Sequence, residues 1–151
     1  MDIPDIRSLV PHAGPMVLLD RVISVDPDNL CAEVAIRSDS VFSGPDGVGG
    51  WVGIEYMAQA IAAHAGYAAW LRDEPIKIGF LLGSRRYECK RSTFALNSVL
   101  HIHVHRVLQT ENGLASFECR IDDREQQALA IATITVFEPA DANDFLKGSL
   151  E

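Results

Sequence analysis

The fold is decided by one stretch of sequence, GGWVGIEYMAQAIAAHAGYAAWLR, which runs from Gly49 to Arg72. It contains seven alanines and no proline, a composition typical of a long α-helix. Apolar residues lie on nearly every side of this predicted helix, so we expect other parts of the chain to wrap around it. Glu55 and Gln59 are four residues apart near its start and therefore share one face.

A bilayer span is the competing interpretation of so apolar a run. Glu55, Gln59 and His64 fall inside it, and the chain has no comparable second segment. We therefore predict a buried helix and no membrane span.

The bulk composition is that of an ordinary globular protein, with 48% apolar and 23% charged residues. A length of 151 residues predicts a single domain over residues 1–151. The net charge of −8 argues against nucleic acid as a partner. The acidic amino-terminal residues have no apolar run typical of a signal peptide, which favours a cytoplasmic location. The cysteines read as reduced thiols, with no spacing typical of a metal site: Cys31, Cys89 and Cys119.

Strand-like segments surround the predicted helix. A short helical turn is expected at residues 5–10, a hairpin of strands at 16–25 and 30–37, an irregular connection at 38–50, and further strands at 76–91, 97–109, 114–122 and 128–138. A nearly all-apolar helix is covered well by a curved antiparallel sheet. The expected fold is therefore α+β, a hotdog fold in which the sheet wraps the long central helix. A lone hotdog leaves a strand edge open, so we expect a homodimer or a heterodimer with another hotdog subunit.

Three segments carry a family resemblance: LVPHAGPMVLLDRV at residues 9–22, IEYMAQA at residues 54–60, and IGFLLG at residues 78–83 followed by Cys89-Lys90-Arg91. They are similar, in matching order, to the 3-hydroxyacyl-acyl-carrier-protein dehydratases of bacterial fatty-acid synthesis. The Pro-His-x-x-Pro-Met opening resembles most the dehydratase-like subunit of aryl polyene biosynthesis clusters. The resemblance implies a hotdog lyase that needs no cofactor and takes its substrate from the phosphopantetheine of acyl carrier protein.

Dehydration of a 3-hydroxyacyl thioester needs a base at C2, an acid at the 3-hydroxyl and a group that stabilises the developing enolate oxygen. The resemblance assigns the acid to Glu55, which we expect to be buried on the apolar helix. Backbone N–H groups at Gly49, Gly50 and Gly53 are the expected binding site of the thioester oxygen. Gln59, one turn beyond Glu55, is expected to orient it.

The family's base histidine lies in a Gly-His-Phe-Pro motif before the helix, and this chain departs from that pattern. The corresponding loop reads VFSGPDG at residues 41–47, and no histidine occurs between Ala13 and Ala63. His12, in its proline-flanked bend, is the leading substitute. Two alternatives stay open: a catalytically silent partner subunit of a dehydratase heterodimer, and a hotdog acyl thioesterase in which Glu55 activates water.

The remaining histidines favour structural roles. His64 is expected to be a satisfied core or interface residue, and His101, His103 and His105 to lie on a solvated sheet face rather than at a metal. One basic cluster stands out in this acidic chain. It is either a solvated strand end or a docking patch for an acidic carrier protein: Arg85, Arg86, Lys90 and Arg91.

Overall fold

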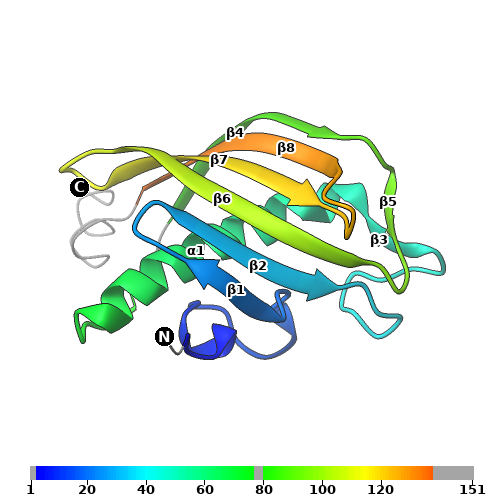
Figure 1. Ribbon diagram of the computed structural model, residues 1–151, viewed down its shortest axis with the longest axis horizontal. Helices are drawn as coiled ribbons and strands as arrows, with labels where there is room; N and C mark the ends of the chain where they lie inside the picture. Colours follow the sequence, from blue (N-terminus) through cyan, green and yellow to red (C-terminus); the bar gives the residue numbers. More distant parts are fainter. Residues whose placement is uncertain (1–2, 77–79, 138–151) are drawn as a thin grey trace, which may run out of the picture.

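The computed structural model describes residues 3–76 and 80–137, and its centre is the helix α1 (Gly53–Leu71). A 3-10 turn, η3 (Gly50–Val52), leads into the helix. A six-stranded antiparallel sheet in the order β1-β2-β6-β7-β8-β4 curves over it (Figure 1). The strands are β1 (Arg21–Val25), β2 (Asn29–Ala35), β4 (Phe80–Cys89), β6 (Val99–Gln109), β7 (Leu114–Asp122) and β8 (Ala128–Phe137). The predicted hotdog architecture is confirmed.

The core lies between the concave face of the sheet and the helix. Alternation along β2 and β6 brings apolar residues to the same face, where Leu30 pairs with Val104 and Ala32 with Ile102. The helix contributes side chains such as Met57, which is fully buried. No helix in residues 3–76 and 80–137 is both long and apolar enough to cross a membrane.

The amino-terminal segment, residues 3–20, covers the helix from the side opposite the sheet (Figure 1). It contains two 3-10 turns, η1 (Ile6–Ser8) and η2 (Gly14–Met16), and it buries Leu9. Gly66 permits this contact, because a Cβ built there would lie 1.8 Å from the carbonyl oxygen of Leu9. The helix is thus held between the sheet and the segment that contains His12.

Two predicted elements differ from those observed. The strand expected over residues 16–25 begins only at Arg21, because the Leu18 N–H donates to the side chain of Gln59 (2.9 Å) and the segment follows the helix before it reaches the sheet. The connection at 38–50 is not wholly irregular. Its end forms β3 (Gly47–Gly49), which pairs with β5 (Thr93–Ala95) beside the start of the helix.

The expectation that Glu55 is buried is wrong for this chain by itself, since its side chain is 39% exposed. The sheet and the amino-terminal segment together leave one strip of the helix surface partly uncovered. The half-buried residues of this strip recur every three or four positions: Ile54, Glu55, Ala58, Ala62, Ala65 and Ala68. Most of them are alanines, so hydropathy alone did not separate this strip from the buried faces.

Replacing Gly66 with Ala tests how closely the amino-terminal segment packs on the helix. Helix propensity alone predicts stabilisation, by about 1 kcal/mol. The contact with Leu9 predicts the opposite sign, a loss of about 1–3 kcal/mol from overpacking. Urea unfolding of Gly66→Ala measures the difference. Gly83→Ala is the matched control, because a Cβ at Gly83 meets nothing within 4 Å. A stabilised Gly66→Ala protein would contradict the contact.

Candidate active site

An imidazole and a carboxylate meet near the start of α1. The Nε2 atom of His12 lies 3.5 Å from Oε1 of Glu55, and the two side chains are 28% and 39% exposed. Nδ1 of His12 is buried and has no hydrogen-bond partner among the described residues. Nε2 is therefore the ring nitrogen that faces the carboxylate of Glu55. Two groups able to exchange protons thus come from distant parts of the sequence to one point.

Gln59 fixes the position of this pair. Its side chain is completely buried, and Oε1 accepts a hydrogen bond from the Leu18 N–H at 2.9 Å. Its Nε2 donates to the Met16 carbonyl at 2.7 Å and to Oε1 of Glu55 at 3.3 Å. One amide therefore joins the amino-terminal segment to the helix and also donates to the carboxylate of Glu55.

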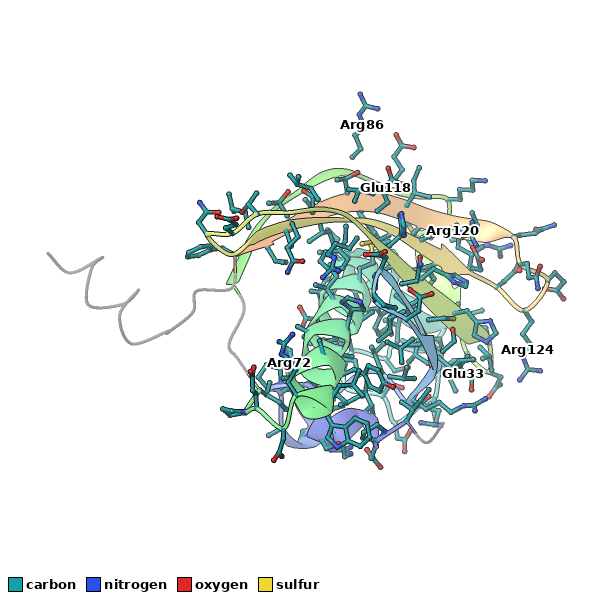
Figure 2. All side chains as sticks on the ribbon, turned by 60° about the vertical axis from the view of Figure 1, so that its left-hand side comes forward. Glu33, Arg72, Arg86, Glu118, Arg120 and Arg124 are labelled. Carbon is teal, nitrogen blue, oxygen red and sulfur yellow. The ribbon has the colours of Figure 1, made fainter. Side chains whose placement is uncertain are left out.

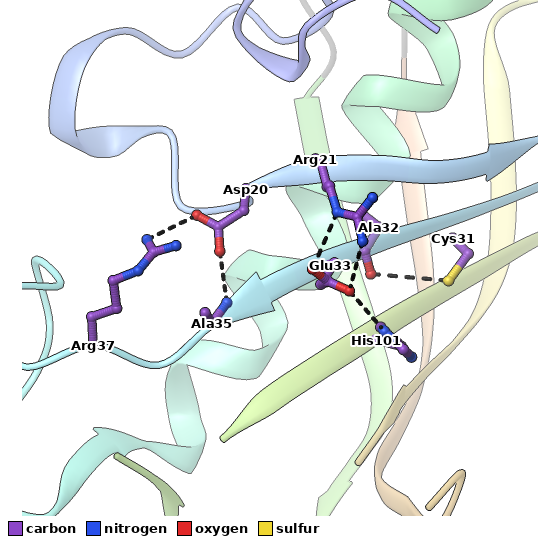
Figure 3. A network of polar contacts seen from close by, with 8 residues as sticks. All are labelled: Asp20, Arg21, Cys31, Ala32, Glu33, Ala35, Arg37 and His101. Atoms are coloured by element: carbon purple, nitrogen blue, oxygen red, sulfur yellow. Dashed lines mark hydrogen bonds and ion pairs between the residues drawn. The ribbon is translucent and has the colours of Figure 1, made fainter. Parts of the chain in front are cut away.

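Asp20 anchors the other end of the amino-terminal motif (Figure 3). Its Oδ2 accepts from the Ala35 N–H at 2.7 Å and its Oδ1 from Arg37 at 3.1 Å, so the residue joins the segment to the end of β2. Next to it, Glu33 accepts from Arg21 and contacts His101. The Arg21 guanidinium, and then His101, lower the pKa of the Glu33 carboxyl. These contacts hold the strand that follows His12 in register.

The three glycines expected at the thioester oxygen lie at the helix start, but two of their N–H groups are already engaged. Gly50 donates to the carbonyl of Ser92 at 2.9 Å, and Gly53 donates to the carbonyl of Gly50. Gly53 also makes room for a neighbour, because a Cβ there would lie 2.0 Å from the hydroxyl oxygen of Tyr87. Gly49 ends β3, opposite Thr93. Gly50 and Gly53 thus have packing roles.

The glycine pattern gives no signal for Trp51, whose N–H group also lies at the helix start. It falls within the 3-10 turn η3, before the N–H groups that find an acceptor inside the turn. The helix dipole makes this end positive, which suits an oxygen that gains negative charge. The run of glycines before the helix favours Gly50 and Gly53, whose N–H groups already have acceptors.

Two tyrosines lie close to the site, and neither is a good proton donor. Burial raises the pKa of Tyr56 to about 12, and the ring packs against Phe94 in the core. Burial also raises the pKa of Tyr87, whose hydroxyl donates to the carbonyl of Gly50. Of the titratable side chains described above at this end of the helix, His12 and Glu55 are the ones that face each other.

The four basic residues expected to form one patch lie in two places. Arg85 and Arg86 lie at an irregularity in the middle of β4, and Arg86 stands out from the convex face of the sheet (Figure 2). Lys90 and Arg91 are exposed just beyond the end of β4. The carbonyl of Arg91 would lie 2.6 Å from a Cβ built on Gly50, which places that residue against the helix start.

The other histidines have structural partners. His64 is 5% exposed and its Nε2 lies 3.1 and 3.0 Å from the carbonyls of Asp26 and Pro27, which confirms the expected core role. No group of side chains in the described ranges could hold a metal ion. The sheet-face histidines pair with polar side chains: His101 with Glu33, His103 with Asp122 and His105 with Asn29.

The long helix wrapped by a curved antiparallel sheet defines the chain as a hotdog protein. Within that class it belongs to the ApeP-like family, whose model, described as ApeP dehydratase, matches residues 4–147. The resemblance to dehydratases is thereby confirmed. A chain of the dehydratase heterocomplex ApeI:P from Xenorhabdus doucetiae is 31% identical, with a TM-score of 0.91 over 99% of this chain and 100% of that one.

More distant solved structures share the fold alone. A hypothetical thioesterase from Streptococcus pneumoniae TIGR4, solved with coenzyme A, is 15% identical, with a TM-score of 0.62 over 78% of this chain and 84% of that one. The E. coli PaaI protein of the phenylacetic acid degradation operon is 14% identical, with a TM-score of 0.58 over 77% of this chain and 80% of that one. No curated protein matches the chain.

Replacing Gln59 with Met tests its role as the connection between segment and helix. The change keeps the volume but leaves the Leu18 N–H and the Met16 carbonyl without a partner. We expect a loss of about 2–4 kcal/mol in the free energy of unfolding, because each buried unpaired group costs about 1–3 kcal/mol. Chemical denaturation measures it, with the exposed Gln127→Met as control. Equal stability of both variants would contradict this role.

Proposed function

We propose that this chain dehydrates a 3-hydroxyacyl chain carried as a thioester on acyl carrier protein, in aryl polyene biosynthesis. The observation that carries the proposal is the 3.5 Å approach of His12 Nε2 to Glu55 Oε1 in a member of a dehydratase family. Dehydration needs a base and an acid on neighbouring carbons, and these two groups supply both.

The proton transfers follow from this geometry. Nε2 of His12 takes the proton from C2, and the electrons of that C–H bond form the double bond between C2 and C3. The C3–O bond breaks, and its oxygen takes a proton from Glu55 and leaves as water. His12 is then protonated and Glu55 ionised, and their 3.5 Å contact provides the route by which the proton returns to the carboxylate.

The helix start supplies the third requirement. During C2 deprotonation negative charge builds on the thioester oxygen, which we place against the N–H group of Trp51 at the start of the helix. Donors held in place before the reaction stabilise such charge without having to reorganise. The helix dipole adds to the effect.

A second hotdog subunit is part of the proposal. Within this chain both His12 and Glu55 remain partly open to solvent, whereas removal of a proton from carbon is favoured in a site that excludes water. Large apolar side chains in the flanking segments are also exposed: Met16, Val41 and Trp51. The related ApeI:P structure is a dehydratase heterocomplex. We propose that a partner subunit covers these residues and closes the site.

The two alternatives predict different products. A catalytically silent partner subunit would have no need for His12 and Glu55 to lie close together. A thioesterase would use Glu55 to activate water and would release a free acid while keeping the hydroxyl. The close His12–Glu55 pair favours an active dehydratase, because it adds a second proton-transfer group that the thioesterase mechanism does not require.

Variants of the two residues test the mechanism. We expect His12→Ala and Glu55→Gln each to lower the rate of dehydration by about two to four orders of magnitude, the usual contribution of a positioned acid or base. The assay follows loss of water from a carrier-bound 3-hydroxyacyl chain by mass spectrometry, with the chain alone and with a partner hotdog subunit. His105→Gln, on the sheet face, is the control and keeps its rate.

Several outcomes would reject this assignment. Full activity of His12→Ala removes His12 as the base. A free acid as the product supports the thioesterase. If dehydration requires the partner and survives both changes in this chain, the chain is the silent subunit.

Charge reversal at the helix start tests carrier docking. Acyl carrier protein is acidic and must bring its thioester to Glu55, so we propose that Lys90 and Arg91 contact it. Lys90→Glu and Arg91→Glu should each raise KM for the carrier-bound substrate by about tenfold while kcat changes little, and added salt should narrow the difference. Arg86→Glu, on the convex face, is the matched control and should leave KM unchanged. An equal rise for Arg86→Glu would contradict this placement.

A further inference from the structure

An apolar cavity lies at the carboxyl-terminal end of α1, far from His12. It is a cavity of about 820 Å³ between the last turns of the helix and the turns that join β1 to β2 and β6 to β7. In Figure 1 the β6–β7 turn projects beyond the rest of the sheet on the same side as the carboxyl end of the helix. Apolar side chains from helix and sheet line the cavity, among them Ile61, Ala65, Ala68, Phe117 and Val136.

The partly uncovered strip of the helix joins the site to this cavity. Glu55 stands at the head of the strip, and Ala65 and Ala68 belong both to the strip and to the cavity wall. Ten residues separate Glu55 from Ala65, a rise of about 15 Å along the helix. Between them the strip presents only Ala58 and Ala62, whose methyl groups leave space for a chain lying along it.

Three ring side chains form part of the cavity wall: His64, Tyr67 and Phe117. His64 meets Phe117 edge to face, with ring centroids 5.8 Å apart. Nε2 of His64 approaches two carbonyls, so it must carry the proton that it donates to them. Burial lowers the pKa of His64, which keeps the ring neutral. Such a wall suits a flat apolar group, since aromatic rings prefer edge-to-face neighbours.

The two arginines in the cavity wall have carboxylate partners. Arg106 contacts Asp28 at 3.1 Å, and Arg72 contacts Glu74 at 3.3 Å. Neither guanidinium therefore requires an anionic ligand.

We propose that this cavity binds the aromatic distal end of the acyl chain while C2 and C3 of the same chain lie beside His12 and Glu55. The inference rests on the proposed dehydratase function and adds to it the place where the substrate's far end is recognised. A conjugated chain is stiff and extended, so it reaches across the alanine strip with little loss of conformational entropy. Short acyl chains end before Ala65 and do not use the cavity.

Filling the cavity tests the proposal. Ala68→Leu adds three carbon atoms to the wall, at a helix position far from Glu55. We expect kcat/KM for an aryl-ended polyenoyl 3-hydroxyacyl carrier substrate to fall by about 10- to 200-fold, the range for a misfit of about one methylene in an apolar pocket. For 3-hydroxybutyryl carrier protein, kcat/KM of the variant should stay within about twofold of the wild-type value. Val107→Phe, an exposed strand residue outside the cavity wall, adds apolar bulk as the matched control and should change neither value.

A binding measurement separates this proposal from the proposed function. The binding probe is a phenyl-ended hexaenoyl pantetheine, which is long enough to span the rise of about 15 Å from Glu55 to Ala65. It should quench the fluorescence of Trp70, which packs against Tyr67 of the cavity wall, in a Trp51→Phe, Glu55→Gln protein, and Ala68→Leu should abolish the quenching. The wild type can show no dehydration of any substrate while the probe still quenches Trp70. In that case the proposed dehydratase function is rejected and the proposal for the cavity stands.

The proposal is overturned by any of three results. In the first, Ala68→Leu lowers kcat/KM equally for the short and the long substrate, which shows that the change acts on the whole fold. In the second, kcat/KM for the long substrate is unchanged while assembly with the partner subunit is lost, which shows that a segment of the partner fills the cavity. In the third, a straight saturated chain of equal length binds as well as the aryl-ended probe and responds equally to Ala68→Leu, which shows that the cavity does not recognise an aromatic end.

Discussion

The arrangement of this site depends on one buried amide. Gln59 is inaccessible to solvent, and every polar atom of its side chain is used by the amino-terminal segment or by Glu55. An amide buried in an apolar helix is stable only if these partners are present, because an unpaired polar group there costs several times what the bond contributes. The partners are backbone groups of Leu18 and Met16, so the segment must lie against the helix for the fold to be satisfied. The position of His12 follows from that requirement.

This accounts for how the site that we propose is assembled without a histidine in the loop before the helix. The reaction requires a base near the acid, and it does not prescribe which part of the chain supplies that base. Here the loop contains β3 and the histidine comes from the segment on the other side of the helix. Two features hold that segment close: the Gln59 amide, and Gly66, where the backbone of Leu9 occupies the space that a side chain would need. A glycine inside a helix weakens it, so its presence makes sense through this contact.

Much of the fold could be predicted because its signals are local. The alanine-rich helix, the alternation along β2 and β6, and the order of strands are all written in neighbouring residues. The start of β1 was missed because Leu18 bonds to a side chain 41 residues away, and no local pattern reports such a contact. The exposure of Glu55 was missed for a related reason. Alanine is compatible with both buried and open faces, so the uncovered strip has no distinctive hydropathy.

The helix both fills the core and presents a surface, the partly uncovered strip, that faces away from the core. A helix that only filled a core would be covered on all sides, and one that only met a partner would present larger apolar side chains there. This strip presents methyl groups, which leave room for a thin chain between the helix and whatever covers it. Larger apolar groups appear beyond its ends, at Trp51 before Glu55 and at Trp70 and Leu71 near the cavity. Small residues along the middle with large ones at both ends are the pattern expected of a channel whose outer wall is another subunit.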